Sequence, residues 1–155
     1  MKIENQVCTL EQAKKLAELL GKHAPESLWV WTETRYQTGV WLILNEDYRD
    51  DIVLDTVQEK RVHSWYSDEF YPAYTGDELG ALLPAYLYIE NYETILTTWK
   101  LNQSWAMAYD RTEDGCCLSE IFDAEHEAHA KADLAISLLE QKIIKPEDFK
   151  YLEGV

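Results

Sequence analysis

Basic residues are scarce in this chain of 155 residues, where 14 Lys and Arg stand against 29 Asp and Glu, for a formal net charge of −15. Binding to nucleic acid requires Lys and Arg to replace counterions along the phosphates, and anionic membrane surfaces attract the same residues. We therefore expect no direct binding to nucleic acid or to a membrane. The imbalance is concentrated in residues 61–130, which contain 13 acidic and 3 basic residues.

Long apolar runs are also absent. The most apolar stretches, 39–44 and 134–139, are far shorter than the roughly 20 residues that a membrane-spanning helix needs. The first seven residues mix charged and amide side chains with isolated apolar ones, so they lack the apolar segment of a secretory signal. These features predict a cytoplasmic protein without a transmembrane helix.

Cysteine is limited to Cys8, Cys116 and Cys117. An odd number of cysteines, two of them adjacent, does not match a secreted disulfide framework, so we expect reduced thiols. A thiol nucleophile would need a pKa lowered by a neighbouring cation or a helix N-terminus. The acidic residues around Cys116, such as Asp114, would oppose thiolate formation, which argues against catalysis by cysteine.

Glycine is equally rare, with six residues in the whole chain. Loops that bind phosphate are built from glycine, and the chain contains neither the P-loop motif nor G-x-G-x-x-G. The G-x-S-x-G motif of serine hydrolases is also missing. We therefore expect no nucleotide site and no bound cofactor.

Residues that form a core are plentiful. Hydrophobic residues make up 46% of the chain, which includes six Trp, ten Tyr and three Phe. A domain of this size buries roughly 68–70% of the surface that its unfolded chain exposes, so it folds without disulfides or metals. No repeat, low-complexity tract or linker divides the sequence. Residues 1–155 are therefore expected to form a single globular domain.

Two helices are indicated by capping boxes, in which a hydroxyl and a Gln or Glu three residues later bond the backbone at a helix start. Thr9 and Gln12 have this spacing, and apolar residues three and four apart follow, which predicts a helix over 10–20. Thr75 and Glu78 repeat the pattern before a run of leucines, which predicts a short second helix.

Strands and a last helix complete the expected fold. Asp123 is expected to cap a long helix over about 124–142, with alanines and leucines along one side. Segments rich in aromatic and β-branched residues predict strands. They lie at 28–36, 40–44, 52–55, 61–66, 94–101, 104–109 and 116–122. The predicted fold class is α+β, with one antiparallel sheet of about five or six strands, the two main helices packed on one face and the short helix at an edge.

The order of these segments resembles that of small uncharacterised proteins from bacteriophages, prophages and gut-type bacteria. The resemblance covers about residues 7–144, while residues 52–70 depart from it. It is carried by Thr9-Leu10-Glu11-Gln12-Ala13-Lys14-Lys15-Leu16, the hairpin around Trp29, Tyr74-Thr75-Gly76-Asp77-Glu78-Leu79, and the end of the last helix at Leu138-Leu139-Glu140-Gln141. It implies a phage or mobile-element setting, in which small acidic proteins often bind a host component, and it brings no catalytic residues.

A metal site is one alternative for function. His126 and His129 are three residues apart, so on a helix both imidazoles face the same side and are candidate metal ligands. Cys116 and Cys117 are candidates to complete a zinc site, although adjacent cysteines rarely hold one metal together. The competing interpretation places the two histidines on a solvated helical face. On that interpretation the chain has no metal site.

Acidic residues are mixed with aromatic ones in two segments, 65–74 and 86–93. Tyr and Trp provide stiff contact area and are enriched in binding hot spots, and a negative field speeds encounter with a basic partner. The competing interpretation buries alternate rings in the core. The predicted binding residues are Trp65, Tyr66, Asp68, Glu69, Tyr71, Asp77, Glu78, Glu90 and Glu93.

These observations favour a non-enzymatic, acidic binding protein of phage or mobile-element type. It would inhibit or modulate a basic host protein, such as a nucleic-acid-handling defence enzyme, by presenting carboxylates where phosphates would lie. Two alternatives remain open. One is a small metal-dependent enzyme that uses His126 and His129, and the other is a structural or accessory protein of the cytoplasm.

Overall fold

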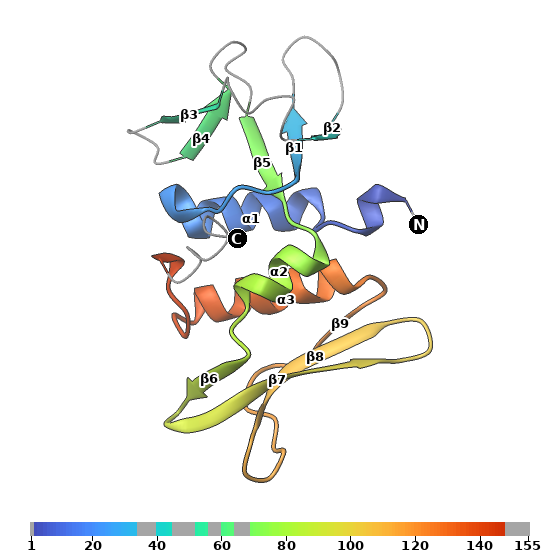
Figure 1. Ribbon diagram of the computed structural model, residues 1–155, viewed down its shortest axis with the longest axis vertical. Helices are drawn as coiled ribbons and strands as arrows, with labels where there is room; N and C mark the ends of the chain where they lie inside the picture. The colour runs from blue at the N-terminus through green and yellow to red at the C-terminus, as the bar shows by residue number, and fades with distance from the viewer. Residues whose placement is uncertain (1, 34–39, 45–51, 56–59, 64–68, 148–155) are drawn as a thin grey trace.

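The structure of the chain is a computed structural model that describes residues 2–33, 40–44, 52–55, 60–63 and 69–147 (Figure 1). Side chains are described for residues 2–31 and 71–147. Two antiparallel sheets form the two ends of the molecule, and the helices lie between them. The α+β class is therefore confirmed.

The helices agree with their predicted caps at two of three positions. They are the 3-10 helices η1 (Ile3–Asn5) and η2 (Gly21–His23), and the α-helices α1 (Leu10–Leu20), α2 (Gly76–Leu82) and α3 (Glu127–Glu140). Both predicted capping boxes form, at Thr9 and at Thr75. The predicted start of the last helix is wrong, because Asp123 lies in a strand that pairs with its neighbour, and His126 occupies the N-cap of α3 instead.

The strands form two sheets, so the predicted single sheet of five or six strands is wrong. The first sheet has the order β2-β1-β5-β4-β3, with strands β1 (Trp29–Glu33), β2 (Val40–Leu44), β3 (Ile52–Asp55), β4 (Lys60–His63) and β5 (Glu69–Ala73). The second has the order β6-β7-β8-β9, with strands β6 (Tyr86–Ile89), β7 (Tyr92–Lys100), β8 (Trp105–Arg111) and β9 (Phe122–Ala124). All the strand pairs are antiparallel.

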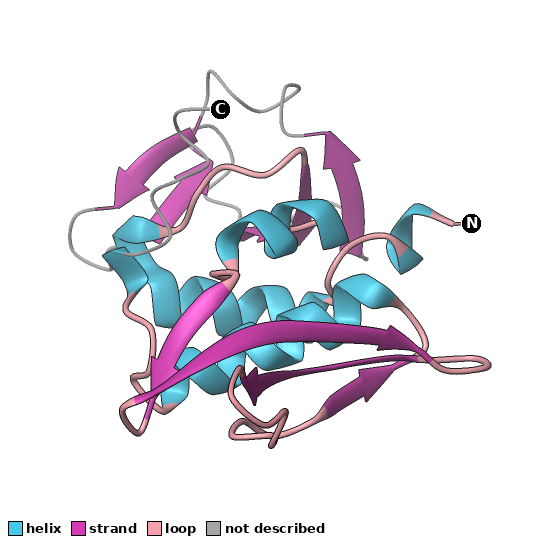
Figure 2. Ribbon diagram, turned by 60° about the horizontal axis from the view of Figure 1, so that its bottom comes forward, coloured by secondary structure: helices cyan, strands magenta, loops and turns pink. Residues whose placement is uncertain are grey.

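The two main helices do not share one face of a sheet. Helix α1 packs on β5 and α3 packs on β8 and β9, while α1 and α3 pack on each other, so each sheet has its own helix (Figure 2). The short helix α2 packs against α3 rather than at a sheet edge. A sheet with apolar residues on one face needs helices or another sheet to cover that face. Two sheets therefore need two sets of covering residues, which α1 and α3 provide here.

The core is built where the helices meet the sheets. Buried side chains of α1, α2, α3 and β8 form one cluster, which includes Leu16, Leu79, Met107, Tyr109 and Leu134. The two large buried tyrosines satisfy their hydroxyls on backbone carbonyls: Tyr74 donates to Pro25 at 2.6 Å and Tyr109 donates to Pro84 at 2.7 Å. No described helix has the length and apolar character that crossing a bilayer requires.

A two-residue turn joins β6 to β7. Glu90 and Asn91 have φ angles of 53° and 69°, and positive φ at both central residues is typical of the type I′ turn that suits the twist of a hairpin. Asn tolerates this conformation, whereas Glu adopts it at a cost of roughly 1–2 kcal/mol. The hairpin thus holds an acidic side chain at a strained position, at the tip of the edge of the second sheet.

Candidate functional site

The residues predicted to bind a partner do not come together in one place. Trp65, Tyr66 and Asp68 lie outside the described residues. Glu69 begins β5, where its backbone is paired with Glu33 and Val62. Tyr71 is half-buried against the core, and the Nζ of Lys14 is 5.7 Å from the centre of its ring.

Asp77 and Glu78 lie at the start of α2, where only Asp77 is exposed. Both carboxylate oxygens of Glu78 accept backbone hydrogen bonds. Oε1 accepts from the Thr75 N–H at 2.9 Å, and Oε2 accepts from the Leu28 N–H at 3.1 Å. Glu78 therefore caps α2 and ties it to the segment that leads into β1. This structural role competes with the predicted role in binding.

The histidines predicted as metal ligands do lie side by side. The rings of His126 and His129 meet edge to face, with 5.1 Å between their centres. Both are half-buried, and His126 lies at the N-cap of α3, so the two histidines do not share a fully solvated helical face. Within the described residues, however, no group of three His, Cys, Asp or Glu is placed to hold a metal ion. Cys116 and Cys117 are exposed in the loop before β9 and do not join the histidines in such a group.

Burial shapes the titration of His129. Desolvation lowers its pKa below the ordinary histidine value, and the charge of His126 acts in the same direction. The carbonyl groups of Glu4 and Val7 and the carboxylate of Asp133 oppose the shift without reversing it. His129 is therefore neutral at physiological pH, and its backbone carbonyl accepts a hydrogen bond from Gln12 at 2.8 Å, which ties α1 to α3.

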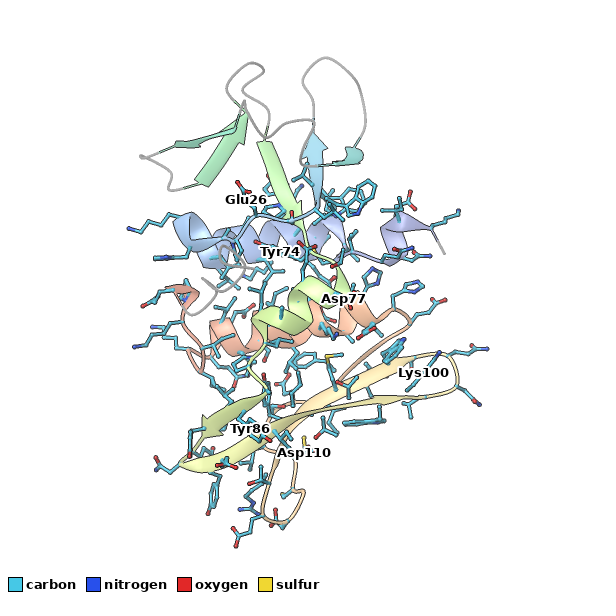
Figure 3. The ribbon with its side chains drawn as sticks, viewed as in Figure 1. Glu26, Tyr74, Asp77, Tyr86, Lys100 and Asp110 are labelled. Atoms are coloured by element: carbon cyan, nitrogen blue, oxygen red, sulfur yellow. The ribbon has the colours of Figure 1, made fainter. Side chains whose placement is uncertain are left out.

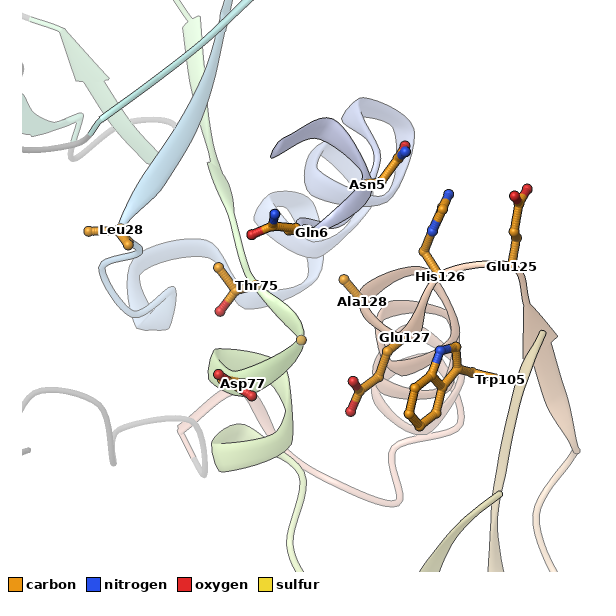
Figure 4. A pocket seen from close by; sticks show the side chains of 11 residues that line it. Asn5, Gln6, Leu28, Thr75, Asp77, Trp105, Glu125, His126, Glu127 and Ala128 are labelled. Carbon is orange, nitrogen blue, oxygen red and sulfur yellow. The ribbon is translucent and has the colours of Figure 1, made fainter. Parts of the chain in front are cut away.

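A pocket of about 370 Å³ lies where η1, α2 and the start of α3 meet, with Trp105 on one side (Figure 4). Its wall carries the carboxylates of Asp77, Glu125 and Glu127 and the imidazole of His126. The carboxylate of Glu127 is already paired with Lys131 at 2.5 Å. Three carboxylates disfavour an anionic ligand at this helix N-terminus.

The more informative surface is on the second sheet. Its inner face carries Leu87, Ile89, Leu96, Met107 and Tyr109, which belong to the core or pack against it. Because side chains alternate along a strand, their neighbours Tyr86, Tyr88, Glu93 and Ile95 share the opposite face. These four are exposed, with fractions of 59% for Tyr86 and 70% for Tyr88.

The strand register places one acid directly beside a ring and a second acid one strand further away. Tyr88 pairs with Glu93, and Tyr86 pairs with Ile95, which in turn pairs with Asp110 of β8. Paired residues of antiparallel strands share a face with their Cβ atoms about 4.5–5.5 Å apart. We call Tyr86, Tyr88, Glu93, Ile95 and Asp110 the β6–β7 face. Figure 3 labels Tyr86 and Asp110 on this sheet.

The charge around the β6–β7 face is strongly negative. Residues 85–127 contain nine Asp and Glu but only two cations, Lys100 and Arg111. Both cations have local partners. Lys100 lies 5.4 Å from the ring centre of Trp105, while Arg111 binds Asp114 through two hydrogen bonds and stacks on Tyr92. The guanidinium lowers the pKa of the Asp114 carboxyl, which stays ionised.

The exposed members of the face lie on β6 and β7, while Asp110 on β8 is half-buried. Further along the same side, Ala106 and Ala108 of β8 are buried. Of the predicted binding residues, Glu93 belongs to the face and Glu90 lies at its tip. Tyr86 and Tyr88 lie in the recognised segment 86–93 but were not predicted to bind, and Ile95 and Asp110 lie outside it. The alternation of large residues in Tyr86-Leu87-Tyr88-Ile89 was the available signal, since it predicts a strand with two rings on one side.

Comparison of the chain with protein-family models, with curated proteins and with solved structures finds no match.

Proposed function

We propose that this chain is a non-catalytic binding protein that docks a basic segment of a partner protein on the β6–β7 face. The observation that carries this proposal is the register of Tyr86, Tyr88 and Ile95, all exposed, with the carboxylates of Glu93 and Asp110. Exposed aromatic groups beside acids form a surface on which Lys and Arg bind both by charge and over the rings.

The rings would supply most of the affinity. Burying about 100 Å² of each exposed Tyr would contribute roughly 2.5 kcal/mol before the entropic costs of association. The carboxylates would supply speed and selectivity, because a negative field attracts basic partners and repels acidic ones. Ion pairs at an exposed rim contribute little affinity by themselves, roughly 0–1 kcal/mol each.

Glu90 gives independent support. Its positive φ is costly for any residue other than Gly, Asn or Asp, and an Asn-Gly pair would make the same turn without that cost. Residues held in such costly backbone conformations cluster at functional sites. We infer that the Glu90 carboxylate contributes to binding, because it lies at the tip of the β6–β7 hairpin, next to the proposed binding face.

The resemblance to phage and prophage proteins suggests the biological setting. We propose that the protein acts in the cytoplasm of a bacterial host and inhibits or modulates a basic host protein. A nucleic-acid-handling enzyme fits this role, because its binding site for phosphates is lined with Lys and Arg. The carboxylates of the β6–β7 face would then occupy positions that phosphates take in the enzyme's complex with nucleic acid.

Affinity capture with matched variants tests the proposal. Purified wild-type protein is immobilised, bacterial lysate is passed over it, and captured proteins are identified at increasing salt. The face variant combines Glu90→Lys with Glu93→Lys. The control combines Glu11→Lys with Glu18→Lys, which makes the same change in net charge on the exposed side of α1.

We expect a basic protein whose capture weakens as salt rises, is lost with the face variant and is retained by the control. Equal loss with both variants would mean that only net charge matters, and the β6–β7 face would then have no special role. Capture that does not respond to salt would contradict the electrostatic basis of the proposal.

A further inference from the structure

Strand β6 forms an open edge of the second sheet. It stands first in the order β6-β7-β8-β9, and within the described residues it pairs only with β7 (Figure 1). An edge strand presents backbone N–H and C=O groups without partners, and these groups can bond to an additional strand. Soluble proteins often protect such edges with Lys or Pro, and β6 contains neither.

The hydrogen-bond pattern shows which groups point outward. The N–H of Leu96 donates to the carbonyl of Ala85 at 2.9 Å, and bonded pairs alternate with non-bonded pairs along an antiparallel ladder. Leu87 and Ile89 therefore bond to β7, and the Thr94 hydroxyl also donates to the Leu87 carbonyl at 2.6 Å. The backbone N–H and C=O groups of Tyr86 and Tyr88 consequently point away from β7, to the open edge.

We propose that an extended, basic segment of a partner protein adds to this sheet as a further strand beside β6, bonded to the backbone of Tyr86 and Tyr88. The inference rests on the proposed function and adds the mode of binding. Strand addition supplies affinity through the main chain, while the residues on either side supply specificity.

The charges around β6 favour a basic occupant. An added strand lies two strand spacings from β7, about 10 Å, and the long side chains of Lys and Arg can cross β6 over that gap toward Glu93. On the way they pass the rings of Tyr86 and Tyr88, which attract cations. Glu90, at the end of β6, extends the negative field along the edge.

A second copy of this chain fits the same edge poorly. Each copy carries a net charge of −15, so pairing two β6 strands would bring two strongly negative molecules together. A net charge of one sign opposes association between copies. The negative charge that attracts a basic strand therefore opposes self-association.

The test uses a capped heptapeptide of alternating lysine and valine as the probe, with the full-length chain. A second peptide has the same sequence with every internal backbone amide methylated, so that it keeps its charge and loses its main-chain donors. Binding is measured by calorimetry at low salt, and amide hydrogen exchange is followed at Tyr86 and Tyr88.

We expect the unmethylated peptide to slow exchange at the Tyr86 and Tyr88 amides by about tenfold or more at saturation, while the methylated peptide binds far more weakly. Equal affinity for both peptides, or exchange that stays fast at both amides, would overturn strand addition. If the Glu90→Lys, Glu93→Lys variant still weakens binding in that case, the proposed function survives. If that variant binds the peptide as the wild type does, the proposed function fails as well.

A pair of variants gives a second measurement. Tyr88→Pro removes the outward N–H without removing a bond to β7, and Tyr88→Val removes the ring but keeps the N–H. We expect Tyr88→Pro to bind the unmethylated peptide roughly three- to tenfold more weakly than Tyr88→Val, the effect of one backbone hydrogen bond. Equal affinities of these two variants would contradict the inference, as would a stable dimer of the wild type that buries β6.

Discussion

Replacing Glu78 by Ala tests whether this carboxylate stabilises the fold or contributes to binding. Glu78 accepts hydrogen bonds from the backbone N–H groups of Thr75 and Leu28, so Glu78→Ala leaves two donors without their charged partner. Loss of a cap costs about 0.5–2 kcal/mol, and a hydrogen bond to a charged group contributes roughly 1.5–3 kcal/mol. Glu78 is partly exposed, so water replaces part of the lost hydrogen bonding. We therefore expect Glu78→Ala to lower the free energy of unfolding by about 2–3 kcal/mol.

The matched control is Asp77→Ala. Asp77 is the adjacent carboxylate in the first turn of α2, but it is exposed, so its removal should cost only the interaction with the helix dipole, about 0.3–1 kcal/mol. For a chain of this length, 1 kcal/mol corresponds to roughly 2–4 °C in Tm, so Glu78→Ala should melt about 4–12 °C below the wild type. Urea unfolding followed by Trp fluorescence gives the free energies directly.

Neither variant should change binding at the β6–β7 face, whereas Glu93→Lys should weaken binding and leave the free energy of unfolding within about 0.5 kcal/mol. The reasoning fails if Glu78→Ala is no less stable than Asp77→Ala. It also fails if Glu78→Ala weakens capture of a basic partner as much as Glu93→Lys does, because Glu78 would then belong to the binding surface.

Three further predictions follow from buried or strained groups. Burial lowers the folded-state pKa of His129 below the ordinary value near 6.5, so the unfolded chain takes up the proton first. The free energy of unfolding should fall as pH drops from about 7 toward the folded-state pKa, and His129→Gln should make this fall shallower in urea titrations; an unchanged slope would contradict the assignment. Burial also raises the pKa of Cys8 to about 12, so a thiol reagent at pH 8 should modify the exposed Cys116 and Cys117 in the folded protein and Cys8 only on unfolding. Rapid modification of all three thiols would contradict the buried position of Cys8. Glu90→Asn should raise the free energy of unfolding by about 0.5–1 kcal/mol while weakening peptide binding, and a loss of stability would rule out strain at this turn.

Local signals in the sequence predicted the helices well. The capping boxes at Thr9 and Thr75 require only residues three positions apart, and both form in the structure. The start of α3 was misplaced because Asp123 suits an N-cap by residue type, while its pairing with Ala106 depends on a strand 17 residues earlier in the sequence. Contacts between distant residues thus override a local preference where a strand precedes a helix.

The division of the strands into two sheets could not be predicted from local patterns. Strand β5 contains Pro72, which argues against a central strand, yet β5 lies between β1 and β4. Within the described residues, β4 pairs with β5 through Val62 and Glu69 at the start of β5, and Pro72 lies three residues further along. Strand β6 was missed because the turn that follows it, Glu90-Asn91, lacks the glycine that usually marks a hairpin.

The candidate site was predicted in composition but not in position. The mixture of acids and rings in 86–93 was recognised, and Glu90 and Glu93 were selected from it. The anchoring rings were placed at Trp65, Tyr66 and Tyr71 instead, and Tyr71 is packed against the core. Which rings are exposed depends on which face of a strand meets a helix, and the packing of α3 on β8 and β9 of the second sheet is not encoded in any local pattern.

The negative charge and the open edge of β6 are best understood together. An exposed edge that carries two tyrosines would ordinarily invite pairing between copies, and soluble proteins avoid this with short strands or charges. Here the strand is short, and each copy carries a net charge of −15, so two copies repel each other on approach. On the proposed function, the same negative charge would attract a strand that carries Lys or Arg. The charge that opposes self-pairing would then also favour a basic partner, and the edge would need no protection by Lys or Pro.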